Sequence, residues 1–539
     1  MEFVLDFLNQ HLEKVLIVAL LGTGLFLTLR LGLIQFRKFF HGIAVVSGKY
    51  DDPNAEGDVT HFQALTTALS ATVGIGNIAG VAIAIHWGGP GAVFWMWVTA
   101  LLGMATKFSE VTLAQHFRVT VKDKNGNSSV SGGPMYYIEK GLGKKWKPVA
   151  VFFAVALILM AMISGNAIQA NTLADLVETL FDIPAFATGM ISTAIVGLVI
   201  IGGIGRIGKV TSILAPSMAA LYVGAGLIAI FLNHEAVIPS INLIFSEAFN
   251  PTAGIAGTGT GAFLQTLMWG VRRGLFSNEA GQGSAPIAHS AAKTKEPVSE
   301  GVVALLEPFI DTIVICSITA LVILTTGVWK QTTPTDFNLS ASDITYVYKV
   351  DNSIVPGESL EFILIENGIQ KSDVQLAWHE VAVEKLFIDK EMSVPFSGKL
   401  NPSLKNAIDK NSITYTTLYG KAVENSAPLT MFAYESALGN FGVMVVLLCV
   451  VLFAISTAIS WSYYGDRCAI YLFGERAILP YRAIYVTMHF VGAILSLNVI
   501  WKLGDLAMAL GTIPNVIALI MLSGLVRKLT KDYFGKKDS

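Results

Sequence analysis

The stretch ATVGIGNIAG, residues 71–80, places three glycines and an asparagine inside an otherwise apolar segment. Glycines at these positions interrupt a helix, and backbone groups left unpaired in hydrocarbon cost several kcal/mol each. Irregular backbone therefore persists at membrane depth only beside protein or a polar cavity, where free amides suit a carboxylate and free carbonyls suit an ammonium group or a cation. We expect Thr72, Gly74, Gly76 and Asn77 to contact a bound ligand, although close helix packing also accounts for glycines at this spacing.

A second interruption lies in LMWGVRRGLFSNEAGQGSAP, residues 267–286, and we expect Trp269 and Phe276 to face the same ligand. This stretch is also charged, and two acids follow one turn apart in the next apolar run. Charges at membrane depth are functional candidates by default. An inner gate and a fixed structural ion pair both fit these charges, which are Arg272, Arg273, Glu279, Glu307 and Asp311.

Polar side chains also occur in two other apolar runs. Gln169 is a lone amide in ISGNAIQANTL, and FAISTAISWSYYG, residues 453–465, carries hydroxyls at Ser456 and Thr457. Trp461 lies four residues beyond Thr457 and hence on the same helix face, where it can limit the size of a ligand. The alternatives are helix packing for Gln169 and Trp461, and hydroxyls that bond back to their own helix.

The composition indicates whether these elements lie in water or in a lipid bilayer. The chain is 53% hydrophobic and only 14% charged, and its mean hydropathy is +0.59, as in an integral membrane protein. About eleven runs are long and apolar enough to cross a bilayer. They lie near residues 14–34, 62–86, 90–116, 148–172, 185–202, 208–232, 259–291, 302–328, 430–464, 477–500 and 503–527.

Lysine and arginine collect in alternate loops and at the C-terminus, whereas the intervening loops are poor in arginine. Basic loops remain cytoplasmic, so the pattern predicts an outside N-terminus and a cytoplasmic C-terminus in a plasma membrane, which we interpret as a prokaryotic inner membrane. The first run is too long for a signal peptide and is interpreted as a retained span. The three cysteines fall in or beside spans and predict neither disulfides nor a metal site.

One segment departs from the membrane pattern. Residues 329–429 alternate apolar and polar side chains in short runs bounded by turn residues, as in ITYVYKV and SITYTTLY. Such period-two patterning predicts β-strands. We expect a small external β domain here, inserted between spans eight and nine, with an unknown surface partner as a candidate ligand.

The remaining spans divide into two groups of five if the first is an accessory helix. Each group then opens with a glycine-broken helix, and the two broken helices run in opposite directions, as in an inverted repeat with its binding site where they meet. The expected divisions are 1–61 for the accessory helix and its loop, 62–232 for the first repeat, 259–328 with 430–527 for the second, and 528–539 for a basic tail.

Several of these motifs resemble those of a known family. TVGIGNIAG resembles the unwound first core helix of transporters with the LeuT fold. The wider set LSATVGIGNIAGVAIAI, GGPGAVFWMW, GGPMYYIEKGLG and RRGLFSNEAGQGSAPIAHSAA resembles the alanine/glycine:cation symporter family. The resemblance covers nearly all the spans, whereas typical members of the family lack the β-rich insert.

The resemblance implies an all-α membrane protein with a LeuT-like 5+5 inverted repeat and one extra N-terminal helix. It implies sodium-coupled import of small neutral amino acids, alanine and glycine, by alternating access, with Na⁺ as the coupling ion and no organic cofactor. Its partners are then the amino acid and the lipid bilayer, with no nucleic acid. Carried over by position, the sodium ligands are the hydroxyls of Ser456 and Thr457 and the carbonyls of Ser70, Val73 and Phe453, while Gln169 and Thr457 contact substrate.

Two other functions remain open from the sequence. Proton coupling would use Glu279 or Glu307 as the proton acceptor and would not depend on sodium. A membrane sensor would use the β-rich insert to bind its ligand, but no cytoplasmic signalling domain follows the last span. An enzyme is not expected, because the sequence contains neither a paired nucleophile and base nor metal-ligand spacing.

Overall fold

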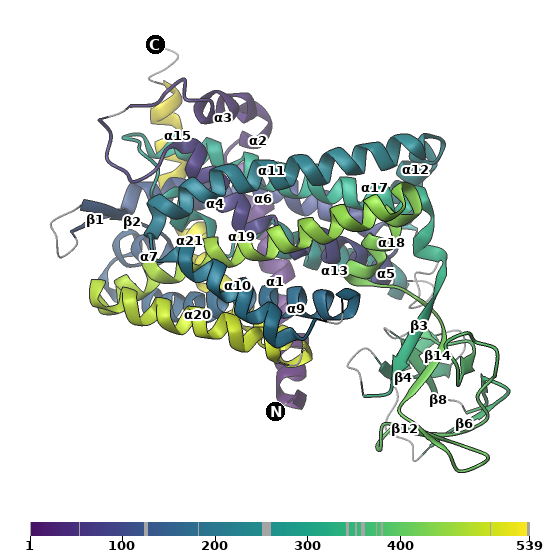
Figure 1. The fold of residues 1–539 in the computed structure, drawn as a ribbon. Helices are drawn as coiled ribbons and strands as arrows, with labels where there is room; N and C mark the ends of the chain where they lie inside the picture. The colour runs from purple at the N-terminus through teal and green to yellow at the C-terminus, as the bar shows by residue number, and fades with distance from the viewer. Residues whose placement is uncertain are drawn as a thin grey trace.

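The computed structural model describes residues 2–52, 54–122, 128–181, 183–250, 260–340, 344–350, 353–356, 362–372, 374–378, 381–495 and 497–535. Long helices form one bundle, and a strand-rich part is attached to one end of it (Figure 1). The predicted boundary at residue 259 and residues 536–539 of the predicted basic tail lie outside the described residues.

The first part of the chain is helical apart from one hairpin. Its α-helices are α1 Glu2–Arg30, α2 Ile34–Arg37, α3 Phe39–Val46, α4 His61–Thr72, α5 Val81–Gly88, α6 Ala92–Phe117, α7 Pro134–Leu142, α8 Lys147–Met162, α9 Ile168–Phe181, α10 Ala185–Ile200, α11 Gly203–Leu232 and α12 Val237–Phe249. Two π-helical segments join neighbouring helices, η1 Gly76–Gly80 and η3 Ile163–Ala167.

The second part begins with another broken helix. Its α-helices are α13 Thr260–Asn278, α14 Ala285–His289, α15 Pro297–Ala304, α16 Leu306–Pro308, α17 Ser317–Thr326, α18 Ser426–Leu438, α19 Asn440–Phe473, α20 Ile478–Ile494 and α21 Leu497–Gly535. The π-helical segment η5 Phe309–Cys316 joins α16 to α17.

Seven helical segments of the described chain are long and apolar enough to span a membrane, and an eighth is counted if the bent pair around residues 73–75 is one span. The described parts of α1 and α10 are apolar but shorter, at Val15–Arg30 and Ala185–Ile200. The protein is therefore a multi-pass, mainly helical membrane protein. The expected total of eleven spans remains a prediction.

Two local features differ from the sequence pattern. The apolar run 430–464 was expected as one span, but Gly439 has a φ of +62° and separates α18 from α19. That left-handed conformation ends a helix and is readily adopted only by glycine. In addition, the basic loop after α6 contains an antiparallel hairpin, β1 Val119–Lys122 with β2 Ser128–Ser131.

The strand-rich part lies between α17 and α18, and its described residues form three antiparallel sheets. Its strands are β3 Thr332–Asn338, β4 Ile344–Val350, β5 Ser353–Pro356, β6 Ile363–Glu366, β7 Ile369–Gln370, β8 Val374–Trp378, β9 Val381–Ala382, β10 Leu386–Phe387, β11 Gly398–Asn401, β12 Asn406–Asp409, β13 Thr414–Tyr415 and β14 Thr417–Val423. The part has its own hydrophobic core, which includes Phe337, Phe396 and Leu400. Strands β3 and β14 pair from Thr332 and Val423 onward and connect it to the bundle.

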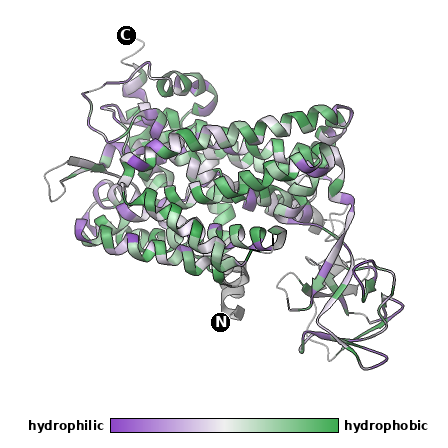
Figure 2. Ribbon diagram, in the orientation of Figure 1, coloured by the Kyte–Doolittle hydropathy of each residue, from purple (hydrophilic) through white to green (hydrophobic). Residues whose placement is uncertain are grey.

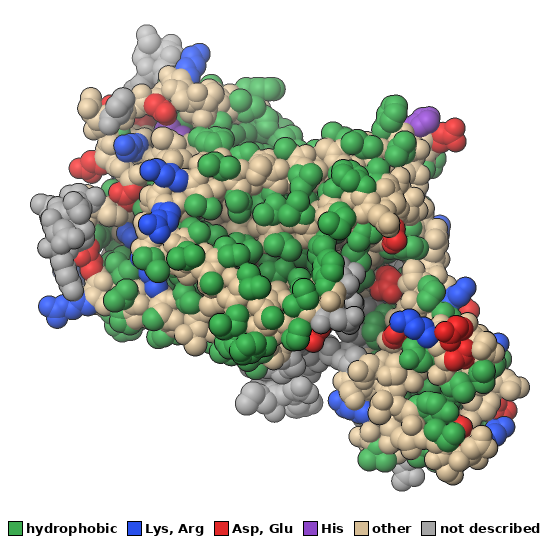
Figure 3. Space-filling model, viewed as in Figure 1, with side chains coloured by type: hydrophobic (Ala, Val, Ile, Leu, Met, Phe, Trp, Pro, Cys, Tyr) green, Lys and Arg blue, Asp and Glu red, His purple; other side chains and the backbone are tan. Residues whose placement is uncertain are grey.

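Charge is distributed unevenly along the bundle. Apolar residues dominate the long helices (Figure 2). On the face shown in Figure 3, hydrophobic side chains cover the middle of the bundle, while lysine and arginine gather at the end that carries α3, α7 and the C-terminal part of α21. We call this the basic end; the strand-rich part lies at the opposite end.

Candidate functional site

The first break lies between α4 and η1, and the two halves of the bent helix meet at 56°. Helix α4 ends at Thr72, and Val73 has an extended ψ of 90°. At Gly74 an added Cβ would lie 2.8 Å from the Thr457 hydroxyl oxygen, and at Gly76 one would lie 3.1 Å from the Phe276 ring. Glycine therefore allows α19 and α13 to approach the backbone of the break closely.

Asn77 holds this break in place from inside the protein. Its side-chain carbonyl accepts a hydrogen bond of 2.9 Å from the Gly74 amide. Its side-chain amide donates to Asp311 Oδ1 at 2.6 Å and to Ser277 Oγ at 3.0 Å. Asp311 also accepts from Ser277 at 2.6 Å and from Thr312 at 2.8 Å. The Asn77 side chain thus links the two broken helices to η5.

The second break lies between α13 and α14, and it is supported by carboxylates. Glu279 has a φ of +53° and accepts a hydrogen bond of 2.5 Å from the Ser284 hydroxyl. Glu110 on α6 accepts from the Gly283 amide at 3.0 Å and from the Asn515 side chain at 2.5 Å. The Glu110 side chain of α6 thus supplies an acceptor for a backbone amide that the helix break leaves without one.

A cavity with about 350 Å³ of free space lies against both breaks. It brings together seven of the nine predicted substrate residues from four separate parts of the chain: Thr72, Gly74, Gly76, Gln169, Phe276, Thr457 and Trp461. The Gln169 side-chain oxygen is buried without a protein hydrogen-bond partner, while its amide donates to the Ser164 carbonyl at 3.2 Å. A buried acceptor in this state is suited to a donor on a ligand.

Two predicted substrate residues do not line this cavity. Asn77 lies directly behind the break, where its side chain makes the bonds described above. Trp269 lies farther along α13 and stacks on Trp87, with 6.1 Å between the ring centroids. The guanidinium carbons of Arg272 and Arg273 lie 5.1 and 5.4 Å from the centroid of the Trp269 ring.

The predicted cation-ligand oxygens converge where α4 meets α19. Thr457 Oγ1 lies 3.2 Å from the Ser70 carbonyl oxygen. Ser456 Oγ lies 3.5 Å from the same carbonyl and 3.1 Å from that of Phe453. All four residues are buried, and Val73, the fifth candidate, is the buried residue that follows α4. These are neutral oxygen donors, which suit a hard monovalent cation.

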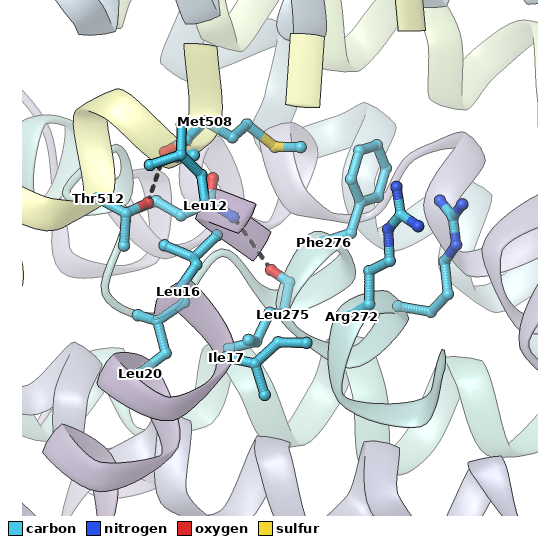
Figure 4. A pocket seen from close by; sticks show the side chains of 12 residues that line it. Leu12, Leu16, Ile17, Leu20, Arg272, Leu275, Phe276, Met508 and Thr512 are labelled. Carbon is cyan, nitrogen blue, oxygen red and sulfur yellow. Dashed lines mark hydrogen bonds between the residues drawn. The ribbon is translucent and has the colours of Figure 1, made fainter. Parts of the chain in front are cut away.

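A larger cavity of about 640 Å³ adjoins the first and shares Phe276, Gln282 and Met508 with it. Figure 4 shows its apolar wall of Leu12, Leu16, Ile17 and Leu20 from α1, with Phe276 and Arg272 on the other side. The aromatic ring of Phe276 therefore lies at the boundary between the two cavities.

The charges assigned to a gate have separate surroundings. Glu307 accepts a hydrogen bond of 2.8 Å from Lys107, and both side chains are fully buried. Asp311 belongs to the Asn77 network, and Glu279 lines the smaller cavity. Arg272 and Arg273 line the larger cavity. The structure thus places these five residues around the site in different contacts, and their role as a gate remains a prediction.

Several residues of the site were not assigned a role from the sequence. Ser164, Gln282 and Met508 line the smaller cavity. Ser164 lies in ISGNAIQANTL, five residues before Gln169, so the polarity of that stretch could have identified it. Met508 and Gln282 carry no comparable signal, because an apolar residue in a span and an amide in a loop are both common.

Comparison with known proteins decides the family. The model of the sodium:alanine symporter family matches residues 1–354 and 411–539. The chain belongs to the sodium:alanine symporter family. The sodium/alanine symporter AgcS of Methanococcus maripaludis is 39% identical over 521 residues, which cover 96% of this chain and 94% of AgcS. An uncharacterized transporter of Haemophilus influenzae is 37% identical over 96% of this chain and 93% of its own length.

Among solved structures, the crystal structure of MhsT in complex with L-phenylalanine aligns with a TM-score of 0.49 and 12% identity, covering 87% of this chain and 89% of MhsT. The family model does not match residues 355–410, and the described residues of this range belong to the strand-rich part. The matched residues include both broken helices and α19.

Proposed function

We propose that this symporter carries small neutral amino acids, alanine and glycine, into the cell together with sodium. The observation that supports this most strongly is the meeting of the two helix breaks, Gln169 and Thr457 of α19 around one small cavity. The backbone amides of the breaks suit the substrate carboxylate, and the free carbonyl groups together with the Gln169 oxygen suit its ammonium group.

The size of the cavity supports small substrates. Trp461 lies directly against Gly165, where an added Cβ would be 2.2 Å from the indole Cγ. Trp461 and Phe276 both line the cavity, so they restrict the room for a substrate side chain. Each methylene that fails to fit costs about 1–3 kcal/mol. In Trp461→Ala, competition by leucine for alanine uptake should increase about tenfold or more, whereas unchanged selectivity would exclude Trp461 as the size filter.

Sodium binding at Ser70, Val73, Phe453, Ser456 and Thr457 would connect the first break to α19. Thr457 lines the substrate cavity and also contacts the Ser70 carbonyl, so one side chain belongs to both sites. An ion held there orders the backbone of the break, which completes the substrate site. This shared residue is the physical basis for the proposed coupling between the two ligands.

The transport cycle follows from that coupling and requires no covalent chemistry. With its basic end in the cytoplasm, the protein takes up sodium and the amino acid from outside, and only the loaded site permits inward opening. Moving one charge through 100 mV supplies about 2.3 kcal/mol, and a tenfold sodium gradient supplies about 1.4 kcal/mol more. At one-to-one coupling, this is sufficient for accumulation of a few hundredfold.

Uptake of labelled alanine into proteoliposomes tests this function. We expect uptake with an inward sodium gradient and little uptake with potassium or choline in its place. Protein-free liposomes supply the background, and Thr457→Ala supplies a variant altered at both proposed sites. Uptake that follows a proton gradient and ignores sodium would instead support proton coupling, and saturable alanine binding without flux would support the sensor.

A further inference from the structure

A continuous chain of acidic and basic side chains runs through the basic end of the bundle. Lys107 donates to Glu307 Oε1 at 2.8 Å, and Glu307 Oε2 lies 3.6 Å from His289 Nε2. His289 Nδ1 is 2.6 Å from Glu300 Oε1, and the other Glu300 oxygen contacts His61 Nδ1. His61 Nε2 lies 4.0 Å from a carboxylate oxygen of Asp51.

The chain extends from the protein interior to its surface. The side chains from Lys107 to Glu300 are fully buried, His61 is 3% exposed and Asp51 is 44% exposed. At its buried end, the charge of Lys107 also interacts with that of Glu279, which lines the substrate cavity. Each histidine has Nδ1 in contact with Glu300 and Nε2 within 4.0 Å of a further carboxylate, so either imidazole is well placed to hold a proton.

Several carboxylates and two cations surround these histidines. The carboxylates that face the chain are Glu110 from α6, Glu279 from the second break, Glu300, Glu307 and the exposed Asp51. The permanent cations are Lys107 on α6 and Arg118, whose charge interacts with that of Glu300. Glu300 contacts both imidazoles and Glu307 lies 3.6 Å from that of His289, so protonated imidazoles are paired with buried carboxylates.

The chain also joins parts of both broken helices to each other at the basic end. His61 is the first residue of α4, the inner half of the first broken helix, and His289 is the last residue of α14, the corresponding part of the second. Glu300 on α15 lies between the two histidines and contacts both. Opening at this end would separate these groups and expose the imidazoles to water.

We propose that His61 and His289 form a proton-binding site of the inwardly closed state, and that their protons leave to the cytoplasm when the basic end opens. This inference rests on the proposed transport function and adds a third ligand, the proton, to it. The site closes again by taking protons from the same side, so it produces no net proton transport. That distinguishes it from proton-coupled symport.

The direction of the pH effect follows from linkage. In the closed site, carboxylates at ion-pair distance favour the charged form of each imidazole although burial opposes it, whereas an imidazole that faces water lacks these partners. The closed state therefore binds more protons than the open state, and its extra stability is present at low pH and lost as the pH rises. Acid on the cytoplasmic side should slow opening, by at most tenfold per pH unit for each proton released.

Right-side-out membrane vesicles containing the full chain test this proposal, because their lumen corresponds to the cytoplasm. Initial alanine uptake is measured at a fixed sodium gradient and clamped potential, with either lumenal or external pH changed. We expect uptake to fall at least about threefold as the lumenal pH drops from 8 to 6, with a smaller response to external pH. Equal responses to the two sides, or no lumenal response, would overturn the proposal.

Variants identify the groups responsible for the lumenal effect. The double variant His61→Gln/His289→Gln keeps hydrogen-bonding side chains but cannot hold the protons, so its uptake should not respond to lumenal pH. His234→Gln, at an exposed histidine distant in the fold, should behave like the unaltered protein. A double variant that retains the full lumenal response would contradict the assignment.

Hydrogen exchange provides a measurement that does not depend on transport. In the purified protein, amides of α14 and α15 should exchange at least about threefold faster at pH 8 than at pH 6 after correction for intrinsic rates. Exchange that is unchanged between these pH values would overturn the proton site. Absence of sodium-dependent uptake at lumenal pH 8 would instead count against the proposed transport function, while the exchange result would still decide the proton site.

Discussion

The two helix breaks are formed by different chemistry although they border the same cavity. At the first, glycines give the backbone its freedom, and a neutral side chain, Asn77, fixes the turn by accepting from the Gly74 amide. At the second, Glu110 accepts from the Gly283 amide, and Glu279 bonds to Ser284 within the loop. The first break is held mainly by the side-chain amide group of Asn77, and the second mainly by the carboxyl groups of Glu110 and Glu279.

This difference suggests a division of roles. The first break leaves its own backbone next to the substrate and the proposed sodium oxygens, so changes there should act on binding. The second break is fastened to α6 and α21 through Glu110 and Asn515, so changes there should act first on the stability of the bundle. Separating binding from stability in variants is therefore the way to test the comparison.

The largest effect is expected in Asn77→Ala. This change removes the acceptor for Gly74 and leaves Asp311 without one of its hydrogen-bond donors. Loss of bonds to buried groups costs about 1–3 kcal/mol per group, and the two losses together should weaken alanine binding by about 100-fold. Equilibrium binding of labelled alanine measures this, with Asn233→Ala at a site remote from the cavity as the control. Affinity within threefold of the control would show that Asn77 does not fix the first break.

Glu110→Gln tests the second break. The substitution replaces the carboxyl group that accepts from both Gly283 and Asn515 by an amide that also carries donors. We expect the free energy of unfolding to fall by about 2 kcal/mol, because a buried donor left without its acceptor costs about 1–3 kcal/mol. Thermal unfolding of the purified protein is the measurement. If the sodium dependence of alanine binding changes while stability does not, the division of roles between the breaks is incorrect.

A smaller effect is expected in Thr457→Ala, which removes one proposed sodium ligand beside the first break. The sodium concentration for half-maximal uptake should rise roughly tenfold, equivalent to about 1.4 kcal/mol. Thr457→Ser retains the hydroxyl and should remain close to the original value. An equal effect of both substitutions would assign the loss to packing, and an unchanged sodium requirement in Thr457→Ala would remove the residue from the ion site.

The smallest effect is expected from removing the strand-rich part. Thr332 and Val423 are paired neighbours at the end of the β3–β14 ladder, so a short glycine-serine linker can replace residues 333–422. Both helix breaks remain intact in this variant, and alanine uptake per folded molecule should stay within about twofold of the original. Loss of alanine binding in a variant that still folds would favour the sensor function over transport.

The sequence allowed the local features to be predicted because each has a local signal. Glycines in an apolar run marked both breaks, and hydroxyls one residue apart marked the proposed ion ligands on α19. The orientation of the Asn77 side chain could not be predicted in this way, because that side chain bonds to Asp311, 234 residues away in the chain. Lys107 donates to Glu307, 200 residues away, although Glu110 lies one turn along its own helix. Such contacts depend on how separate helices pack, which local periodicity does not encode.

The central claim is that one cavity couples an amino acid to sodium through the first break and α19. Equilibrium binding of labelled alanine to the purified protein tests it most directly, with sodium replaced stepwise by potassium at constant ionic strength. If this coupling exists, sodium tightens alanine binding and alanine tightens sodium binding by the same factor. Alanine binding of equal affinity in sodium and in potassium would contradict it.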